Sequence, residues 1–285
     1  MLMGRSLKSF LTLLRPHQWL KNLLLLFPPF FGAKLVSDGN LTAFIPAFIA
    51  FSFAASSTYI VNDIIDRNAD RQHSVKKNRG IARGDVSIFS AAIIAGILYV
   101  ASMMLGSGVS EHFLGYLIIY LLLSLSYSMF FKRILLLDIF VIASGYVIRV
   151  KAGGEVFHVA VSNWLFLTVF IVALFLAAGK RLAELVERGE AASSHRQVLN
   201  EYSISFLEGI LWFSASSSLV AYSLYVIENK DVMLYTVPVA AYGLLRYIFV
   251  VKQGKGDPTE VLLNDGHILI TGVLWAAMIA MIIYR

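Results

Sequence analysis

The sequence predicts an all-α integral membrane protein with nine transmembrane helices. Hydrophobic residues make up 58% of the 285 positions and charged residues only 15%, and the mean hydropathy is +0.72. A soluble domain of this length needs far more polar surface. Apolar stretches recur that approach the roughly 20 residues with which a helix crosses a bilayer. Their expected boundaries are 20–36, 41–61, 87–108, 111–130, 134–149, 160–179, 205–227, 232–250 and 266–284.

Lys and Arg are distributed unequally over the connections between these stretches. With nine spans, the N-terminus lies on the same side as the loops after the second, fourth, sixth and eighth spans, and that side holds most of the cations. Because cytoplasmic loops carry the excess of Lys and Arg, we expect a multi-pass protein of a bacterial-type inner membrane with a cytoplasmic N-terminus. The net charge of +6 therefore reflects topology and anionic ligands, and no nucleic-acid partner is predicted. The opposite side carries only Lys34, Lys151, Lys230 and Arg285.

The remaining features of the composition favour a single domain over residues 1–285. The chain has no cysteine, which excludes disulfides, thiolate metal sites and a cysteine nucleophile. No internal repeat or low-complexity linker interrupts it. Leu7, Phe10, Leu11 and Leu14 recur at the spacing of one helix face, so residues 1–18 are predicted to lie on the membrane interface. The oligomeric state stays open.

The connections predicted to be cytoplasmic, 62–86, 180–204 and 251–265, are the longer ones, so we expect the chemistry on that side. The first span contains "FPPFFG", where the prolines remove backbone donors and predict a bent helix. In "DPTEVLLND", Asp257 is predicted to cap a helix that has Pro258 at its first position and Glu260 as capping-box partner. Charges near the middle of the spans are few, which favours an enzyme over a transporter.

Three carboxylates follow the second span in "VNDIIDRNADRQ". If the helix continues, Asp63, Asp66 and Asp70 share one face, with Asn62 one turn before Asp66. At about 5–6 Å between neighbouring Cβ atoms, each pair repels by roughly 3 kcal/mol at an effective dielectric constant of about 20. Hard oxygen ligands near phosphate groups predict Mg²⁺, or Mn²⁺, as the offsetting cation. The alternative is a solvated cytoplasmic loop.

"NDIIDRNAD" resembles the N-D-x-x-D-x-x-x-D motif of the UbiA superfamily of membrane prenyltransferases. "KKNRGIARGD" is similar to the family's K-K-x-R-P-I-x-x-G continuation, with Gly80 where proline is usual, and "SYSMFFKR" is similar to its fourth-helix ending. The resemblance extends over essentially the whole chain. It implies nine transmembrane helices in a bundle around a cavity open to the cytoplasmic face, with Asp63, Asp66 and Asp70 as catalytic residues that hold Mg²⁺ on a diphosphate.

The loop after the sixth span departs from the usual pattern of this family, which has a second aspartate motif there. Here the loop begins "AAGKRLAELVERG" and contains no aspartate. Lys180, Arg181 and Glu184 stand at the predicted membrane edge, either as ligands of a phosphate group or as snorkelling cations with an intrahelical Lys180–Glu184 pair. The missing motif argues against a polyprenyl diphosphate as the donor.

"RPHQWLKN", "LLLDIFVIASGYVIRVKAGG" and "GKRLAEL" resemble one branch of the family, the decaprenyl-phosphate phosphoribosyltransferases. The resemblance implies Mg-dependent transfer of 5-phosphoribose from phosphoribosyl diphosphate to a polyprenyl phosphate, with release of diphosphate, in cell envelope biosynthesis. The acceptor phosphate is already anionic and needs no strong base. Cations at the membrane surface would let the two anionic substrates approach. The predicted substrate-binding residues are Lys21, Asn22, Asn62, Lys76, Arg79, Tyr127, Lys132, Arg133, Asp138, Lys180, Arg181 and Glu184.

Other interpretations stay open at this point. A prenyltransferase could use the single acidic cluster, with Lys180 and Arg181 holding the diphosphate, and a transporter or scaffold is the alternative from another class. Asp138, inside the fifth span, is expected to pair with a substrate hydroxyl or with a cytoplasmic-edge cation, or to form a purely structural ion pair. Arg149 follows about 16 Å along the helix and is expected to be an anchor on the far side of the membrane. His17 and His73 show no ligand spacing.

Overall fold

Helices are the regular elements of the part of the chain that the structure describes. The computed structural model describes residues 12–35, 40–72, 76–188 and 197–285. Within these ranges, seven helical segments are long and apolar enough to cross a membrane, in agreement with the predicted all-α membrane protein. They are α3 (Asn40–Ile65), α6 (Ile88–Val109), α7 (Glu111–Met129), α9 (Asn163–Arg188), α10 (Ile204–Asn229), the continuous pair η6 (Asp231–Thr236) and α11 (Val237–Val251), and α13 (Gly266–Ile283).

The first and fifth expected spans are not among these seven segments. Where a bent α-helix over 20–36 is expected, the chain forms the 3₁₀ helix η1 (Pro16–Leu26) and the short α2 (Phe27–Phe31). The fifth expected span is α8 (Leu137–Val156), which carries Asp138 and Arg149 among its charged side chains. The count of nine transmembrane helices therefore stays a prediction.

Short helices connect the long ones. The N-terminus of α12 forms as expected, because the Asp257 carboxylate accepts hydrogen bonds from the backbone N–H groups of Thr259 and Glu260, with Pro258 at the first helical position. This cap satisfies donors that have no partner within the helix. Of the predicted interfacial segment, residues 1–11 lie outside the described residues. The short helices are α4 (Arg67–Gln72), η2 (Lys76–Asn78), α5 (Gly80–Arg83), η3 (Phe131–Arg133), η5 (Gln197–Asn200) and α12 (Pro258–Asn264).

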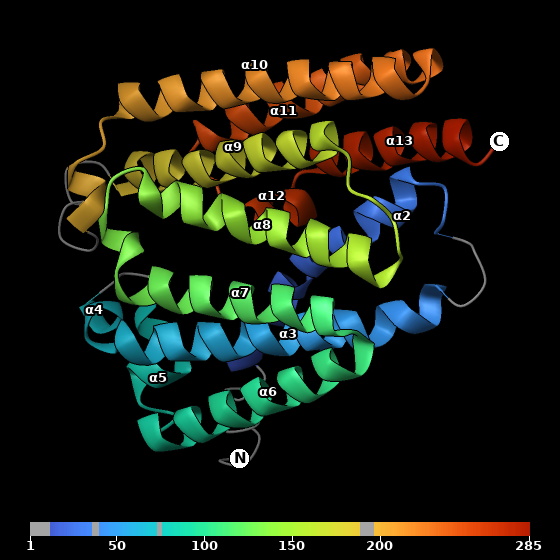
Figure 1. Cartoon of the computed structure of the whole chain (residues 1–285). Helices are drawn as coiled ribbons and strands as arrows, with labels where there is room; N and C mark the ends of the chain where they lie inside the picture. The colour runs from blue at the N-terminus through green and yellow to red at the C-terminus, as the bar shows by residue number, and fades with distance from the viewer. Residues whose placement is uncertain (1–11, 36–39, 73–75, 189–196) are drawn as a thin grey trace. The chain divides into compact units, whose positions relative to one another are not determined.

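The chain divides into two compact units, each with its own core. In unit 1, α3 packs along α6 and α7, around a core that includes Phe51 and Phe113. In unit 2, α9 packs along α10, and the buried core includes Phe175 and Tyr247; Figure 1 labels these helices. The single domain expected over 1–285 stays a prediction. Unit 1 consists of Met1–Pro29, Lys34–Lys132 and Ile148–Val159, and unit 2 of Phe30–Ala33, Arg133–Val147 and Ala160–Arg285.

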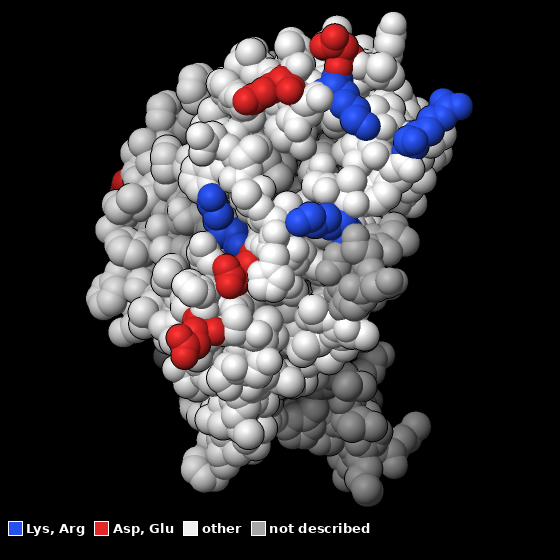
Figure 2. All heavy atoms as spheres, turned by 45° about the vertical axis from the view of Figure 1, so that its right-hand side comes forward, with Lys and Arg blue, Asp and Glu red and all other residues white. Residues whose placement is uncertain are grey.

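Large apolar side chains cover much of the outer surface of the long helices. Phe89 and Met104 on α6 are 76% and 70% exposed, and Ile270 on α13 is 68% exposed. On the face that Figure 2 shows, Lys, Arg, Asp and Glu side chains are few and most of the described surface is uncharged. Such a surface is unfavourable against water and suits the hydrocarbon core of a bilayer. The protein is a multi-pass membrane protein.

Contacts that repeat every three residues hold η1 against α3. Trp19 Nε1 donates to Ser56 Oγ, and Asn22 Nδ2 donates to Ser52 Oγ, both at 3.0 Å. A 3₁₀ helix has three residues per turn, so Trp19 and Asn22 lie on one face, together with the fully buried Leu25. Ser52 and Ser56 are one α-helical turn apart. These side-chain bonds hold η1 against α3 where an α-helix was expected.

A close approach between two backbones joins η1 to the part of α8 that belongs to unit 1. A Cβ atom on Gly153 would overlap the carbonyl oxygen of Leu25 and would lie 2.8 Å from its Cα. No rotamer change relieves such a clash, because both obstructing atoms are backbone. Glycine at this position is therefore what allows η1 to lie directly on α8.

We predict that Gly153→Ala lowers the stability of the protein by about 1–3 kcal/mol, the usual range for overpacking a core. The measurement is the thermal unfolding midpoint of the purified protein in detergent. Gly96→Ala is the matched control, because Gly96 is also a helical glycine but a Cβ atom added there would have nothing within 4 Å. An equal midpoint for the two variants would contradict the close approach.

Candidate active site

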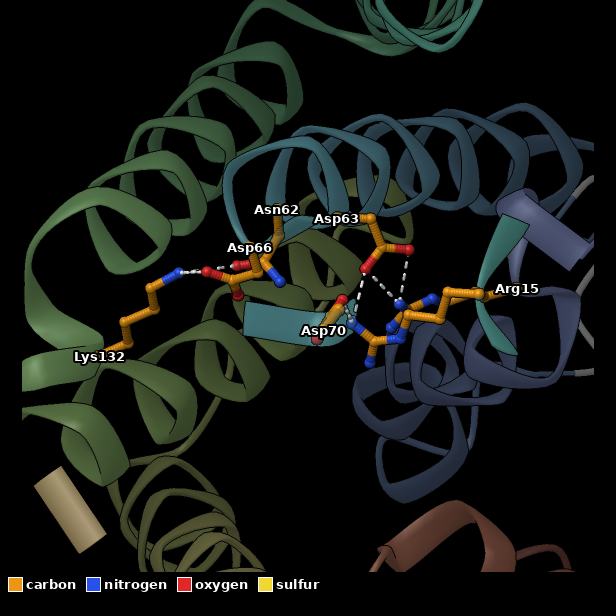
Figure 3. Close-up of polar contacts among 7 residues, drawn as sticks. Arg15, Asn62, Asp63, Asp66, Asp70 and Lys132 are labelled. Atoms are coloured by element: carbon orange, nitrogen blue, oxygen red, sulfur yellow. Dashed lines mark hydrogen bonds and ion pairs between the residues drawn. The ribbon is translucent and has the colours of Figure 1, made fainter. Parts of the chain in front are cut away.

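Two of the three predicted metal ligands, Asp63 and Asp70, meet around arginine side chains in unit 1 (Figure 3). Arg79 Nη1 donates to Asp63 Oδ1 at 2.8 Å and to Asp70 Oδ2 at 2.7 Å. Arg15 Nη2 donates to both oxygens of Asp63, at 2.6 and 2.8 Å. Hydrogen bonds between ionised groups are about twice as strong as neutral ones. These hydrogen bonds hold together the end of α3, helix α4 and the chain before η1.

The third carboxylate, Asp66, turns to a different cation. Its Oδ1 accepts from Lys132 Nζ at 2.5 Å, and Asn62 Oδ1 lies 3.5 Å from the same nitrogen. Figure 3 shows Asp66 directed toward Lys132 and away from the Asp63–Asp70 pair. The expectation that all three aspartates share one helix face is therefore wrong for Asp66. The backbone bonds from Asp66 to Asn62 and from Asp70 to Asp66 keep helical spacing, so the difference lies in the side-chain partners, Lys132 for Asp66 and arginines for Asp63 and Asp70.

Burial makes the charge balance of this cluster important. Asp63 is 3% exposed and Asp70 is 4% exposed, which is unusual for carboxylates unless they are paired. Burial raises the pKa of Asp70 above its usual value, and the neighbouring Arg79 opposes that rise. Each negative charge of the cluster has a positive charge nearby. Asp63 and Asp70 are matched by Arg15 and Arg79, and Asp66 is matched by Lys132. The interpretation of a merely solvated loop does not describe Asp63 or Asp70.

The donor set of the cluster fits a divalent cation. Among the described residues, no group of three or more acidic or histidine side chains is close enough to hold one ion. The oxygens of Asp63 and Asp70 nevertheless converge on a single positively charged nitrogen, Arg79 Nη1, which stands where a cation shared by the two carboxylates would lie. Carboxylate oxygens are the ligands that Mg²⁺ accepts most readily from proteins. Among the described residues, the Asp63–Asp70 pair thus offers carboxylate oxygens of the kind that a divalent cation needs.

Arg15 is a member of the cluster that sequence reasoning did not select. Its backbone is left-handed, with φ of 50°, although it is not glycine and precedes Pro16. Strain of this kind is found where the surrounding structure requires one particular placement. A signal was present in its position at the start of "RPHQWLKN", a stretch that carries the family resemblance. In the sequence, Arg15 is one of many cations on the predicted cytoplasmic side, so its charge alone did not single it out.

Asn22, a predicted substrate-binding residue, lies in a buried network in unit 1. Its Oδ1 accepts from Arg149 Nε at 2.8 Å, and Arg149 Nη2 donates to the Tyr120 hydroxyl at 3.0 Å. The Arg149 guanidinium also lies over the Tyr120 ring, 4.6 Å from its centroid. Arg149 is only 4% exposed, so the expectation of an anchor at the far membrane surface is wrong. A buried Arg that binds side chains of two other helices organises the interior instead.

The predicted residues of unit 2 form a second buried network. Asp138 is fully buried and accepts from Arg181 Nε at 2.7 Å and from the Tyr202 hydroxyl at 2.7 Å. Arg181, 1% exposed, also donates to Glu184 at 3.0 Å. The Tyr202 hydroxyl in turn accepts from the backbone N–H of Leu136, which has φ of 65°. The structure thus gives Asp138 an ion pair with a cytoplasmic-edge cation of the sequence, and it adds Tyr202, which sequence reasoning missed.

Burial and Asp138 together change the acid–base behaviour of Tyr202. Removal from water raises the pKa of its hydroxyl well above the ordinary value, and the hydrogen bond to the Asp138 carboxylate raises it further. Tyr202 therefore stays neutral and donates its proton to Asp138. It acts as a fixed hydrogen-bond donor and not as a base.

Lys180 pairs differently from the expectation. Its Nζ donates to Asp257 Oδ2 at 2.6 Å, whereas Glu184 accepts from Arg181. The intrahelical Lys180–Glu184 pair is thus replaced by two other ion pairs. The Lys180 side chain remains 37% exposed, so it is the more accessible of the two cations at this position.

The other predicted binding residues lie on short helices and on α7. Lys21 is half-buried on η1, Lys76 lies in η2, and Tyr127 is half-buried on α7. Arg133 is exposed at the end of η3. Their assignment to substrate stays a prediction. His17 is exposed on η1, and His73 lies outside the described residues.

We predict that Asp138→Leu and Arg181→Met each lower the stability of the protein by about 3–5 kcal/mol, because each leaves a buried charge without its partner. The double variant should be less destabilised than the sum of the two, since an apolar pair replaces an ionic one. Lys180→Ala, which alters a partly exposed pair, is the control and should change the unfolding midpoint little. Strictly additive effects in the double variant would contradict the buried pair.

The chain is similar in sequence to proteins of known name. The profile of the UbiA prenyltransferase family matches residues 25–271. The decaprenyl-phosphate phosphoribosyltransferase of Mycolicibacterium smegmatis is 33% identical over 95% of this chain and 91% of its own length. The protein of the same name from Corynebacterium glutamicum is 30% identical over 95% of this chain and 85% of its own length.

The fold is also similar to that of a solved structure. A UbiA homolog from Archaeoglobus fulgidus, in a structure bound to DMAPP and Mg²⁺, superposes with a TM-score of 0.76 over 97% of this chain and 99% of that chain, at 17% identity. The chain has the UbiA-type fold, and with a family profile that spans most of its length it belongs to the UbiA prenyltransferase family.

Proposed function

We propose that this protein transfers 5-phosphoribose from phosphoribosyl diphosphate to a polyprenyl phosphate in the membrane and releases diphosphate, in a reaction that depends on Mg²⁺. The observation that carries the proposal is 33% identity with a decaprenyl-phosphate phosphoribosyltransferase over nearly the whole of both chains. The segment 180–204, which begins inside α9 with Lys180 and Arg181, contains no aspartate, which agrees with a donor other than a polyprenyl diphosphate.

The Asp63–Asp70 pair is the proposed site of the donor's diphosphate. Mg²⁺ held there would neutralise charge that develops on the leaving diphosphate. Arg15 and Arg79 contribute fixed positive charge to the same place, and their hydrogen bonds to the carboxylates use only Nη2 of Arg15 and Nη1 of Arg79. The other guanidinium N–H groups can donate to phosphate oxygens. Asp66 and Lys132 would orient the metal ligands or the diphosphate from the other side of the α3–α4 turn.

The acceptor needs orientation more than activation. A phosphate monoester is already an anion near neutral pH, so its oxygen can attack the anomeric carbon without a general base. Consistent with this, the described contacts of the two networks include no histidine, and Tyr202 is a neutral donor. The positive charge of Lys180 and of Arg181 is proposed to hold a phosphate group that does not leave, either the 5-phosphate of the donor or the phosphate of the lipid. Lys180 is the more accessible, and Arg181 is fixed by Asp138 and Glu184.

A prenyltransferase is the second candidate. The archaeal homolog with a similar fold has been solved with DMAPP and Mg²⁺, and its 17% identity supports the fold alone. The same aspartate pair could hold a polyprenyl diphosphate, with Lys180 and Arg181 as further ligands. The higher identity to the phosphoribosyltransferases, over 95% of the chain, favours the first candidate.

We further propose nine transmembrane helices and an N-terminus and active site on the cytoplasmic side of a bacterial inner membrane. The seven apolar segments, the apolar η1–α2 region and the length of α8 support this count. The excess of Lys and Arg near the ends of α3, α7, α9 and α11 supports the orientation.

We predict that Asp63→Asn and Asp70→Asn each lower kcat/KM at least tenfold, about 1.4 kcal/mol of transition-state stabilisation, because each removes charge from the proposed metal site. Asp66→Asn should have a similar effect through its pair with Lys132. Chelation of divalent cations should abolish turnover, and Mg²⁺ or Mn²⁺ should restore it. Asp85→Asn is the control, because Asp85 pairs with an exposed arginine and lies outside both networks. Full activity of a variant in which Asp63, Asp66 and Asp70 are all replaced by Asn, measured in the presence of a chelator, would rule out a metal role for these aspartates.

The donor is tested directly with purified protein, Mg²⁺, a polyprenyl phosphate and radiolabelled phosphoribosyl diphosphate. We expect a phosphoribosylated lipid and free diphosphate in equal amounts. In sealed membranes, inverted vesicles should use added donor and right-side-out vesicles should not, because the donor is charged and impermeant. If the mixture is inert while a polyprenyl diphosphate alkylates an aromatic acceptor, the second candidate is correct.

A further inference from the structure

The 3₁₀ helix η1 presents three distinct faces, because its residues repeat every three positions. The first face carries Trp19 and Asn22, which bind α3. The second carries Leu20 and Leu23, which are 36% and 40% exposed, and it begins with the exposed His17. The third face carries two polar side chains, the buried Gln18 and the half-buried Lys21.

Gln18 is buried without using its polar group. Its side chain is about nine-tenths buried, at 9% exposure, and it makes no hydrogen bond to any side chain or backbone group that the structure describes. Its amide atoms are not among the described side-chain atoms that are both shut off from solvent and without a partner, so water reaches the carboxamide. The carboxamide therefore hydrogen-bonds to water or to a bound molecule, and to no group of the chain that the structure describes. An apolar residue would be the better choice if the position served only packing.

The surroundings of Gln18 connect it to the proposed donor site. Its backbone N–H donates to the carbonyl oxygen of Arg15 at 2.9 Å, and the Arg15 side chain binds Asp63. Lys21, one turn further along the same face, lies about 6 Å away along the axis at the 2.0 Å rise of a 3₁₀ helix. Gln18 thus stands between a residue that binds the aspartate cluster and a second cation.

We infer that Gln18 is a specificity-determining residue that binds a ribose hydroxyl of the donor. A carboxamide both donates and accepts hydrogen bonds, and a hydroxyl does the same, so the two satisfy each other fully. A phosphate only accepts, and the cations Arg15 and Lys21 on either side already suit it. A polyprenyl phosphate has no hydroxyl on its chain. The inference rests on the proposed function and adds to it a contact that distinguishes the sugar-bearing substrate from the lipid.

The test combines a variant with substrate analogues. Gln18→Leu should lower kcat/KM for phosphoribosyl diphosphate about tenfold and leave the KM for polyprenyl phosphate unchanged. With wild-type protein, the 2-deoxy or the 3-deoxy analogue of the donor should react about tenfold less efficiently than the donor itself. With Gln18→Leu, that penalty should disappear for the hydroxyl that Gln18 contacts, because the two changes remove the same interaction.

Two further measurements separate this contact from a structural role. Gln18→Leu and the unbranched Gln18→Met should unfold at about the same temperature as wild type, because each keeps most of the side-chain volume and removes an amide that no described group of the chain binds. Donor added without lipid should stabilise both variants less than it stabilises wild type. His17→Leu, on the exposed face of the same helix, is the matched control and should alter none of these quantities.

The possible failures are distinguishable. One result would be an active wild-type protein together with a Gln18→Leu variant in which the deoxy analogues lose as much kcat/KM as they do with wild type. This result would overturn the Gln18 assignment and leave the proposed function intact. A rise in the KM for the lipid alone, or a loss of stability in both variants, would overturn it as well. Wild-type protein that neither binds nor uses phosphoribosyl diphosphate would overturn the proposed function and the assignment with it.

Discussion

The sharing of two buried carboxylates between two guanidinium groups is the constraint on which the rest of unit 1 depends. Asp63 lies at the end of α3, Asp70 in α4 and Arg79 just before α5, and Arg15 precedes η1. Neither carboxylate could stay ionised at this burial without a cation, and neither arginine is placed by its own helix. The cluster therefore fixes the path of four chain segments at once. The left-handed backbone of Arg15 is the local strain that this arrangement requires.

The two buried networks solve the same problem in different ways. In unit 1, hydrogen bonds from arginines hold the aspartates in place while their oxygens converge on one cationic position, so an incoming cation can take over contacts that already exist. In unit 2, Arg181 is enclosed by Asp138 and Glu184, and the neutral Tyr202 completes the shell around Asp138. The first network is suited to exchange one positive charge for another. The second holds the Arg181 guanidinium at a constant position between two carboxylates.

Local sequence patterns predicted the elements that depend on local physics. The long apolar segments α3, α6, α7, α9, α10 and α13 follow from hydropathy, and the Asp257 cap follows from side-chain chemistry within one turn. Local patterns gave a wrong prediction where residues distant in the sequence determine the structure. Nothing within 16–26 indicates a 3₁₀ helix, and the contacts that hold this segment come from Ser52 and Ser56 on α3 and from the close approach at Gly153. The placement of Arg149 inside unit 1 and the pairing of Asp66 with Lys132 depend on tertiary partners in the same way.

The residues that the sequence pointed to differ in one physical respect from those that it did not. Asp63, Asp70 and Arg79 were selected because acidic and basic side chains crowd into a short polar segment after an apolar span, where their mutual repulsion requires a counter-charge. Arg15 and Tyr202 were not selected because membrane proteins often place Arg and Tyr at interfaces, where they need no special partner. What distinguishes Arg15, Tyr202 and Gln18 is a three-dimensional property. Arg15 has a strained backbone, Tyr202 donates to a fully buried carboxylate, and Gln18 is a buried residue whose amide no described group of the chain binds. The strain at Arg15 and the buried charge of Asp138 are unfavourable in isolation, and contacts with other groups of the chain compensate for them.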